Sequence, residues 1–142
     1  MSDLRQREAR ERDKPYLAWV ARLRCLPCLC LHGTLNRGVE VCHIRMSNAE
    51  AGWFNAGLQQ KPHDRRTFPA CPEHHRHGKD SQHHWGDEAA WWAWIGVDPV
   101  ALVDALNAAF DAKRDGNAVL ATFAARARRT RGAAGSEPQH PS

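Results

Sequence analysis

A cluster of metal-binding residue types lies in the middle of the chain. Between Cys71 and His84, fourteen residues carry one thiol and five imidazoles. Thiolates and imidazoles are the side chains that bind zinc and related divalent ions, and few other roles need so many of them together. The spacing therefore predicts that metal binding is central to this protein, with the upstream cysteines as candidate partners for the cluster.

Two pairs of residues have the spacing of a tetrahedral zinc site. Cys25 and Cys28 form a Cys-x-x-Cys pair, and Cys71 and His74 form a Cys-x-x-His pair. Two intervening residues allow one tight turn to direct both side chains at a single ion, and four protein ligands make the site structural. The alternative is that the cysteines are simply small buried apolar residues. Cys30 competes for a ligand position in the first pair, although we expect it to pack in the core.

Composition limits the class of protein. The chain has 142 residues, a formal net charge of +4 and 25% charged residues, which favours one soluble domain and permits a polyanionic partner. No apolar run approaches the roughly 20 residues of a membrane span, and residues 1–15 contain no apolar signal-peptide core. We therefore expect a cytoplasmic protein without a membrane partner. Its five cysteines, an odd number, favour metal ligation over disulfides in a reducing compartment.

Periodicity predicts the elements that position these residues in an α+β fold. The first cysteine pair follows a short amphipathic helix over 15–24, which Pro27 is expected to stop. The remaining predicted elements are listed in chain order: a charged arm over 1–14, strands over 39–44 and 67–70 separated by a long loop, helices over 71–79, 89–95, 100–112 and 118–131, and a disordered tail over 132–142. We expect residues 15–99 to form the functional domain and residues 100–131 to add C-terminal helices.

Several motifs occur in a specific order over about residues 15–99. They are Cys25/Cys28, Glu40-Val41-Cys42-His43-Ile44-Arg45, Lys61-Pro62-His63-Asp64-Arg65, Pro69-Ala70-Cys71-Pro72-Glu73-His74-His75, Gln82-His83, and Trp91 through Gly96-Val97-Asp98-Pro99. This order resembles that of the HNH endonucleases, also called ββα-metal or His-Me finger nucleases. More narrowly, it resembles the phage and prophage HNH-like group related to the RecA-dependent recombination-enhancement nucleases.

The resemblance implies a small zinc-stapled ββα-metal domain with flanking helices, acting as a metal-dependent DNA endonuclease in a bacterium or phage-infected host. His43 would be the general base, because an imidazole can accept a proton near neutral pH. His75 and His83 would hold one catalytic ion such as Mg²⁺ or Mn²⁺. The predicted phosphate-contacting side chains are Arg45, Lys61, Arg65 and Arg66.

Two positions depart from the HNH pattern. Cys42 stands where that pattern has a metal-binding Asp or His, and a thiol is a poor Mg²⁺ ligand, so the third ligand is open between Cys42 and Glu40. Arg66 takes the place of the middle Asn, with Asp64 as a candidate for its orienting role. The alternative function is therefore a catalytically silent, zinc-stabilised DNA-binding or recombination accessory protein, with DNA and a recombinase filament as partners.

Overall fold

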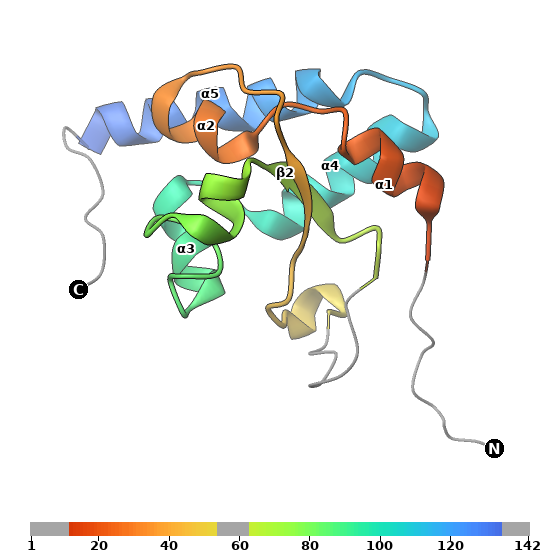
Figure 1. Cartoon of the computed structure of the whole chain (residues 1–142), viewed down its shortest axis with the longest axis horizontal. Helices are drawn as coiled ribbons and strands as arrows, with labels where there is room; N and C mark the ends of the chain where they lie inside the picture. Colours follow the sequence, from red (N-terminus) through yellow and green to blue (C-terminus); the bar gives the residue numbers. More distant parts are fainter. Residues whose placement is uncertain (1–11, 54–62, 135–142) are drawn as a thin grey trace.

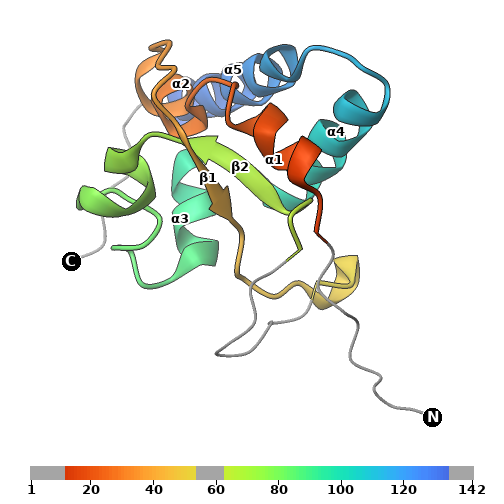
Figure 2. The same ribbon diagram turned by 45° about the vertical axis from the view of Figure 1, so that its right-hand side comes forward.

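A two-stranded antiparallel sheet lies at the centre of the computed structural model, which describes residues 12–53 and 63–134 (Figure 2). β1 (Glu40–His43) pairs with β2 (Thr67–Ala70), and the register sets His43 opposite Thr67. All four residues of β2 are buried, because helices pack against this strand. The prediction of an α+β fold with a hairpin at these positions is confirmed.

The N-terminal part of the chain forms two short helices. α1 (Lys14–Val20) begins after Asp13, whose carboxylate accepts a hydrogen bond from the first turn. The prediction that Pro27 stops a helix over 15–24 is wrong, since the chain turns after α1 and then begins α2 (Leu26–His32). Pro27 lies in the first turn of α2, where its missing N–H needs no partner and its fixed φ already suits a helix.

A π-helical segment, η2 (Glu73–His77), follows β2 where the sequence predicted a helix over 71–79. Its wider turn ends when the Gly78 N–H donates to the Glu73 carbonyl at 2.8 Å. Single π turns of this kind are often found at functional sites. The short 3₁₀ turn η1 (Ala49–Ala51) lies in the predicted long loop, and the buried Trp53 follows it.

Three helices complete the fold: α3 (Glu88–Ile95), α4 (Pro99–Asp111) and α5 (Gly116–Ala134). All three were predicted to within a few residues. In Figure 1, α5 runs along α2 and α4, and both pairs are in contact. Most of the predicted arm over 1–14 and of the tail over 132–142 lies outside the described residues.

The core joins the sheet to the C-terminal helices through aromatic side chains. Phe68 of β2 packs against both Trp91 and Trp92, with ring centroids 5.8 and 4.7 Å apart. Arg131 of α5 donates to the carbonyls of Cys30 and Trp94, both at 2.8 Å, and so ties α5 to α2 and α3. These contacts hold α2, the helix that carries Cys28, against the rest of the domain.

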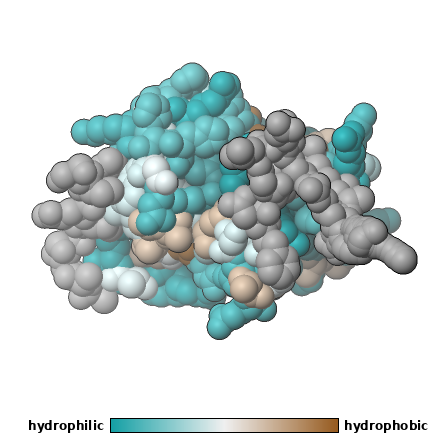
Figure 3. Space-filling model, turned by 90° about the horizontal axis from the view of Figure 1, so that it is seen from below, coloured by the Kyte–Doolittle hydropathy of each residue, from teal (hydrophilic) through white to brown (hydrophobic). Residues whose placement is uncertain are grey.

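On the face shown in Figure 3, most of the described residues are hydrophilic, and a small apolar patch lies near the centre. In the part of the chain that the structure describes, no single helix is long and apolar enough to cross a membrane. Together α3 and α4 reach that length and apolarity, but they meet at a bend of 74°.

Candidate metal centre

Four side chains from three elements converge at one end of the hairpin. Cys25 caps the start of α2, Cys28 lies in its first turn, Cys71 follows β2 and His74 lies on η2. All four are buried, and their ligand atoms lie within 4.8 Å of one another. The structure therefore brings together the two pairs that the sequence predicted to share one site, although Cys28 and Cys71 are 43 positions apart in the chain.

The distances in this Cys₃His cluster fit a structural zinc ion. The Cys28 and Cys71 sulfurs lie 3.9 Å apart, and Nδ1 of His74 lies 3.6 Å from the Cys28 sulfur and 3.3 Å from the Cys71 sulfur. A tetrahedral zinc ion with Zn–S bonds of about 2.3 Å separates two ligand sulfurs by about 3.8 Å. Three thiolates and one imidazole complete a zinc coordination sphere and leave no position for a substrate. The cluster could thus hold a metal ion that stabilises the fold.

Backbone and side-chain N–H groups surround the sulfurs. The Cys25 sulfur accepts hydrogen bonds from the backbone N–H groups of Cys28 and Cys71 at 3.4 and 3.2 Å. The Asn36 amide donates to the Cys28 sulfur at 3.7 Å. Such contacts orient metal-binding thiolates and stabilise their negative charge.

Hydrogen bonds and burial shift the pKa values of the three cluster thiols in different directions. The hydrogen bond from the Cys25 thiol, and to a lesser degree those from His74 and Asn36, lower the pKa of Cys28 to about 3. The same hydrogen bond and burial raise the pKa of Cys25, and burial raises that of Cys71. Binding of a metal ion therefore requires Cys25 and Cys71 to release their protons.

The two remaining cysteines do not join the cluster. Cys30 is buried, and burial raises its thiol pKa to about 12, which agrees with the expected packing role. Cys42 is also buried, and its thiol donates to the Glu40 carbonyl at 3.5 Å. Burial raises the Cys42 pKa well above its usual range. Cys42, one of the two candidates for the third ligand of the catalytic ion, is therefore a neutral thiol in the core.

A histidine–carboxylate pair lies where β1 ends. Nε2 of His43 is 3.2 Å from Oδ1 of Asp64, and the Asp64 side chain is only 3% exposed. The other Asp64 oxygen accepts from the Asp13 N–H at 2.9 Å, and the Thr67 hydroxyl donates to the Asp64 carbonyl. Asp64 is therefore held in place and can orient the His43 ring, the role for which the sequence made it a candidate.

The two histidines predicted to share a catalytic ion are in contact. The His75 and His83 rings lie edge to face, 4.6 Å apart between centroids. Nδ1 of His75 also contacts a Glu40 oxygen at 2.7 Å, and Glu40 binds Arg76 through both oxygens. Hydrogen bonds from Arg76 and His75 lower the Glu40 pKa to about 2, so this carboxylate is charged. Partial burial and the neighbouring His75 lower the pKa of His83.

These groups do not complete a second metal cluster on their own. Among residues 12–53 and 63–134, the Cys₃His cluster is the set of three or more His, Cys, Asp or Glu donors that converges on one point. Glu40, the other candidate third ligand, is instead occupied by Arg76 and His75. His75 and His83, the two predicted ligands of the catalytic ion, are therefore in contact. Among the described residues, no third donor converges on one point with both of them.

Gln82, which the sequence marked only as a motif residue, and Glu88, which it did not mark as a site residue, connect the segments that carry these histidines. The Gln82 amide donates to the His43 carbonyl at 3.2 Å and to the Glu88 carboxylate at 2.8 Å. Glu88 also accepts from the Arg45 backbone N–H and from the Trp92 ring N–H, both at 3.0 Å. The Gln82–Glu88 pair thus joins the end of β1 to the His83 segment and to α3. In the sequence, Glu88 looks like an ordinary acidic residue at a helix start.

The four predicted phosphate-binding residues have different environments. Arg45 is exposed, whereas Arg65 binds Asp13 at 2.8 Å and Asp111 at 3.0 Å. A phosphate contact from Arg65 would therefore have to break two ion pairs. The Arg66 guanidinium lies over the Trp53 ring, 5.3 Å from its centroid. Lys61 lies outside the described residues.

The candidate site therefore has two parts that share η2. One part is the buried Cys₃His cluster, and the other contains the His43–Asp64 pair and the His75–His83 contact. His74 and His75 are neighbours in the chain, yet each belongs to a different part. No protein-family model, curated protein or solved structure matches this chain.

Proposed function

We propose that this protein is a metal-dependent endonuclease of the HNH type that hydrolyses phosphodiester bonds in DNA. The observation that carries the proposal is the His43–Asp64 pair at the end of a hairpin whose following segment brings His75 against His83. The order strand, strand, short helical segment supports the ββα arrangement that the resemblance implies. A structural zinc ion in the Cys₃His cluster would hold this arrangement together.

His43 is the proposed general base. Because its Nε2 faces the Asp64 carboxylate, the favoured tautomer carries the proton on Nε2 and makes Nδ1 the basic nitrogen. His43 accepts a proton from a water molecule, and the resulting hydroxide attacks the phosphorus atom. The P–O bond to the leaving sugar oxygen breaks, and that oxygen takes a proton from solvent. Asp64 stabilises the imidazolium and keeps the ring oriented.

In this proposal, a divalent ion and basic side chains hold the scissile phosphate. A divalent ion bound by His75 and His83 would supply Lewis-acid stabilisation of the developing negative charge. Arg45, Lys61 and Arg66 are the proposed phosphate contacts, which position DNA without reading its sequence. The net charge of +4 permits such a partner. We place this activity in the cytoplasm of a bacterium or phage-infected host.

A catalytically silent DNA-binding or recombination accessory protein is the second candidate. The buried, neutral Cys42 thiol and the occupied Glu40 carboxylate favour it, because neither is available as the third ligand of a Mg²⁺ or Mn²⁺ ion. In this case the Cys₃His cluster still stabilises the fold, and DNA or a recombinase filament is the partner.

A plasmid-nicking assay separates the two candidates. Supercoiled DNA is incubated with wild-type protein and added Mg²⁺, Mn²⁺ or Ni²⁺, with and without a recombinase filament on single-stranded DNA. For an endonuclease we expect metal-dependent cleavage that His43→Ala reduces at least about 100-fold. His77→Ala is the matched control, since His77 is an exposed imidazole on the same segment. Cleavage only in the presence of the filament would show a nuclease that depends on the filament, whereas no cleavage in either condition rejects the enzyme and supports the catalytically silent candidate.

Variants of the adjacent residues His74 and His75 provide a second test, which distinguishes the structural zinc site from the proposed catalytic site. His75→Ala should abolish cleavage and leave one zinc ion per chain, whereas His74→Ala should lose the zinc ion together with the fold. Zinc content is measured by mass spectrometry of dialysed protein. Loss of zinc from His75→Ala would show that the two histidines have been assigned the wrong way round.

A further inference from the structure

The positive charge of the chain is concentrated in two segments that carry none of the proposed catalytic residues. Residues 21–39, which contain α2, and residues 116–134, which form α5, hold seven arginines and no aspartate or glutamate. The whole chain has 20 lysines and arginines and 16 aspartates and glutamates. Without these seven arginines, the 13 remaining basic residues are fewer than the 16 acidic ones, so the excess positive charge comes from the two segments.

The fold places these two segments side by side. α2 and α5 lie along each other at the upper edge of the molecule in Figures 1 and 2, and they are in contact. Gly33 ends α2 with a left-handed φ of 69°, and a Cβ atom at this position would lie only 3.0 Å from Nη1 of Arg128. Near the start of α5, the Arg24 backbone N–H donates to Oδ1 of Asn117 at 2.9 Å. The arginines of α5 are therefore brought beside a segment that adds no negative charge.

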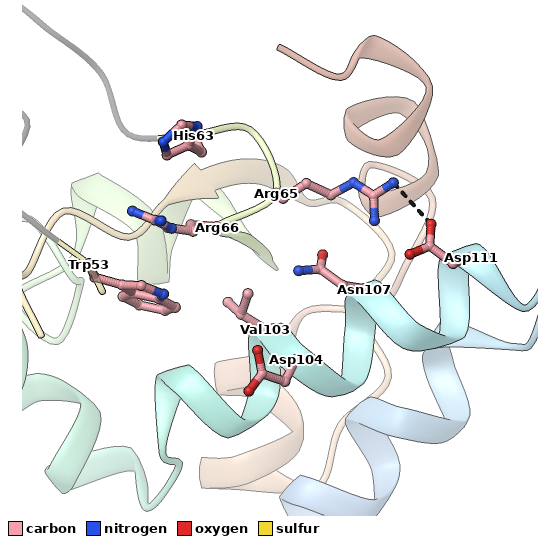
Figure 4. A pocket seen from close by; sticks show the side chains of 8 residues that line it. All are labelled: Trp53, His63, Arg65, Arg66, Val103, Asp104, Asn107 and Asp111. Carbon is pink, nitrogen blue, oxygen red and sulfur yellow. Dashed lines mark hydrogen bonds and ion pairs between the residues drawn. The ribbon is translucent and has the colours of Figure 1, made fainter. Parts of the chain in front are cut away.

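Three arginines in the C-terminal half of α5 are exposed: Arg126, Arg128 and Arg129, which we call the basic face. Among the residues that the structure describes, none of the three forms an ion pair. Figure 4 shows the contrast with Arg65, which pairs with Asp111 of α4 at 3.0 Å. The charges of the basic face are therefore left for a partner outside the described chain.

The stability of α5 does not explain the basic face. Arg126 and Arg129 are three positions apart, so they are neighbours on the helix surface, where like charges destabilise a helix. The helix macrodipole attracts cations within the last turn, which holds Arg131. Arg131 also donates to the carbonyls of Cys30 and Trp94. Folding therefore accounts for Arg131, whereas the three arginines of the basic face favour a polyanionic partner.

The surroundings of the basic face indicate phosphate contacts without base stacking. Single-stranded nucleic acids bind to aromatic side chains that stack on the bases. The aromatic side chain of α5, Phe123, is only 9% exposed, and the Arg126 guanidinium lies over its ring at 5.3 Å. Duplex DNA needs no exposed ring, because its phosphates bind arginine directly. The other exposed residues along this part of α5 are small: Ala121, Thr122, Ala125 and Thr130.

We propose that the basic face binds the phosphate backbone of double-stranded DNA, at a contact separate from the proposed cleavage site. The inference rests on the proposal that DNA is the partner. It requires neither His43 nor a catalytic ion, so it applies equally to the catalytically silent candidate. Arg126, Arg128 and Arg129 each contact a phosphate, and contacts of this kind hold the duplex without reading its sequence.

Binding is measured by fluorescence anisotropy of a labelled duplex, with zinc-loaded full-length protein and no other divalent ion, so cleavage plays no part. The test variant combines Arg126→Gln, Arg128→Gln and Arg129→Gln, and it should bind at least tenfold more weakly at about 50 mM salt. The slope of log affinity against log salt should become less steep by about 2.7, because each lost phosphate contact contributes about 0.9. Arg129→Gln alone should change the slope by about 0.9.

The matched control removes the same charge from exposed positions outside the basic face. It combines Lys14→Gln, Lys113→Gln and Arg114→Gln, and its salt slope should change by less than about 1. Glutamine suits a helix about as well as arginine, so the test variant should melt no lower than wild type, and any lost binding is not lost fold. Equal losses of affinity in the two triple variants would overturn the inference, because binding would then follow net charge alone.

Unlabelled competitors identify the partner. The duplex should compete at least fivefold better than its single strands and better than polyglutamate. Equal or better competition by the single strands would overturn the assignment to duplex DNA, and the same result with polyglutamate would indicate an acidic protein instead. Plasmid nicking by a protein whose test variant binds the duplex as wild type does would overturn only this inference. Lost binding in the test variant of a protein that fails the nicking assay would reject only the proposed enzyme.

Discussion

Replacing Cys71 by alanine should remove the metal ion and the fold together. Cys71 contributes one of three sulfurs to the buried cluster, and its backbone N–H also contacts the Cys25 sulfur. Without the Cys71 sulfur, only three protein ligands remain for a structural site that needs four. The variant also leaves the unneutralised thiolate of Cys28 in a mostly buried environment.

The size of this effect follows from the structure. Structural zinc sites contribute about 10–16 kcal/mol of apparent binding free energy, whereas a whole domain is stable by only about 5–15 kcal/mol. Here the cluster joins α2, the end of β2 and η2, and the described sheet has only two strands. Since the zinc contribution is as large as the total stability, the variant should not reach the native state at room temperature.

Cys42→Ala is the matched control. This variant also removes a cysteine sulfur, at a position that is at least as buried: Cys42 has 0% exposure, against 6% for Cys71. Cys42, however, lies outside the cluster. The expected cost is on the order of 1 kcal/mol, which lowers the melting temperature by roughly 2–8 °C for a chain of this size.

The assay combines metal content with thermal unfolding. Both variants are dialysed with a thiol reductant, analysed for zinc per chain, and then heated while circular dichroism is recorded. We expect one zinc ion per chain and a cooperative transition for Cys42→Ala, and neither for Cys71→Ala. A Cys71→Ala protein that unfolds cooperatively within a few degrees of Cys42→Ala would refute the structural-zinc reasoning, whatever its zinc content.

Three further predictions concern catalysis, proton release and packing. Asp64→Asn should reduce DNA cleavage at least about 100-fold with unchanged zinc content, because the neutral amide no longer stabilises the His43 imidazolium. Zinc affinity, measured by chelator competition, should rise at least about 100-fold from pH 6 to pH 7, because at least two of the three thiols, those of Cys25 and Cys71, must release a proton on binding. Arg131→Ala should lower the free energy of unfolding in urea by about 2 kcal/mol, because it removes the hydrogen bonds to two carbonyls.

Each of these has a contrary outcome. Full cleavage by Asp64→Asn would show that His43 needs no carboxylate partner. A zinc affinity that does not change with pH would mean that the cysteines are already deprotonated in the metal-free protein. Arg129→Ala is the control for Arg131, and an equal loss of stability in both would mean that the two carbonyl contacts contribute nothing specific.

The sequence by itself determined the parts that depend on short-range geometry. The Cys-x-x-Cys and Cys-x-x-His spacings indicated the four residues of the cluster that could hold a metal ion, because two intervening residues suffice to turn both side chains toward one point. Alternation of residue types indicated a strand over 39–44, residues 67–70 were expected as its hairpin partner, and apolar periodicity indicated the C-terminal helices. Pro27 was misjudged because a proline suits the first turn of a helix as well as the residue after one.

Only the tertiary structure decided which side chains remain available for chemistry. Arg65 is as basic in the sequence as Arg45, yet its partners Asp13 and Asp111 lie 52 and 46 positions away. The core position of Cys42 and the contact of Glu88 with the Gln82 amide likewise depend on how β1 packs against its neighbours. Such pairings follow from long-range packing, which local spacing does not encode. For this reason the sequence predicts the metal cluster well, and the structure is needed to distinguish the candidate catalytic groups from the residues that hold them.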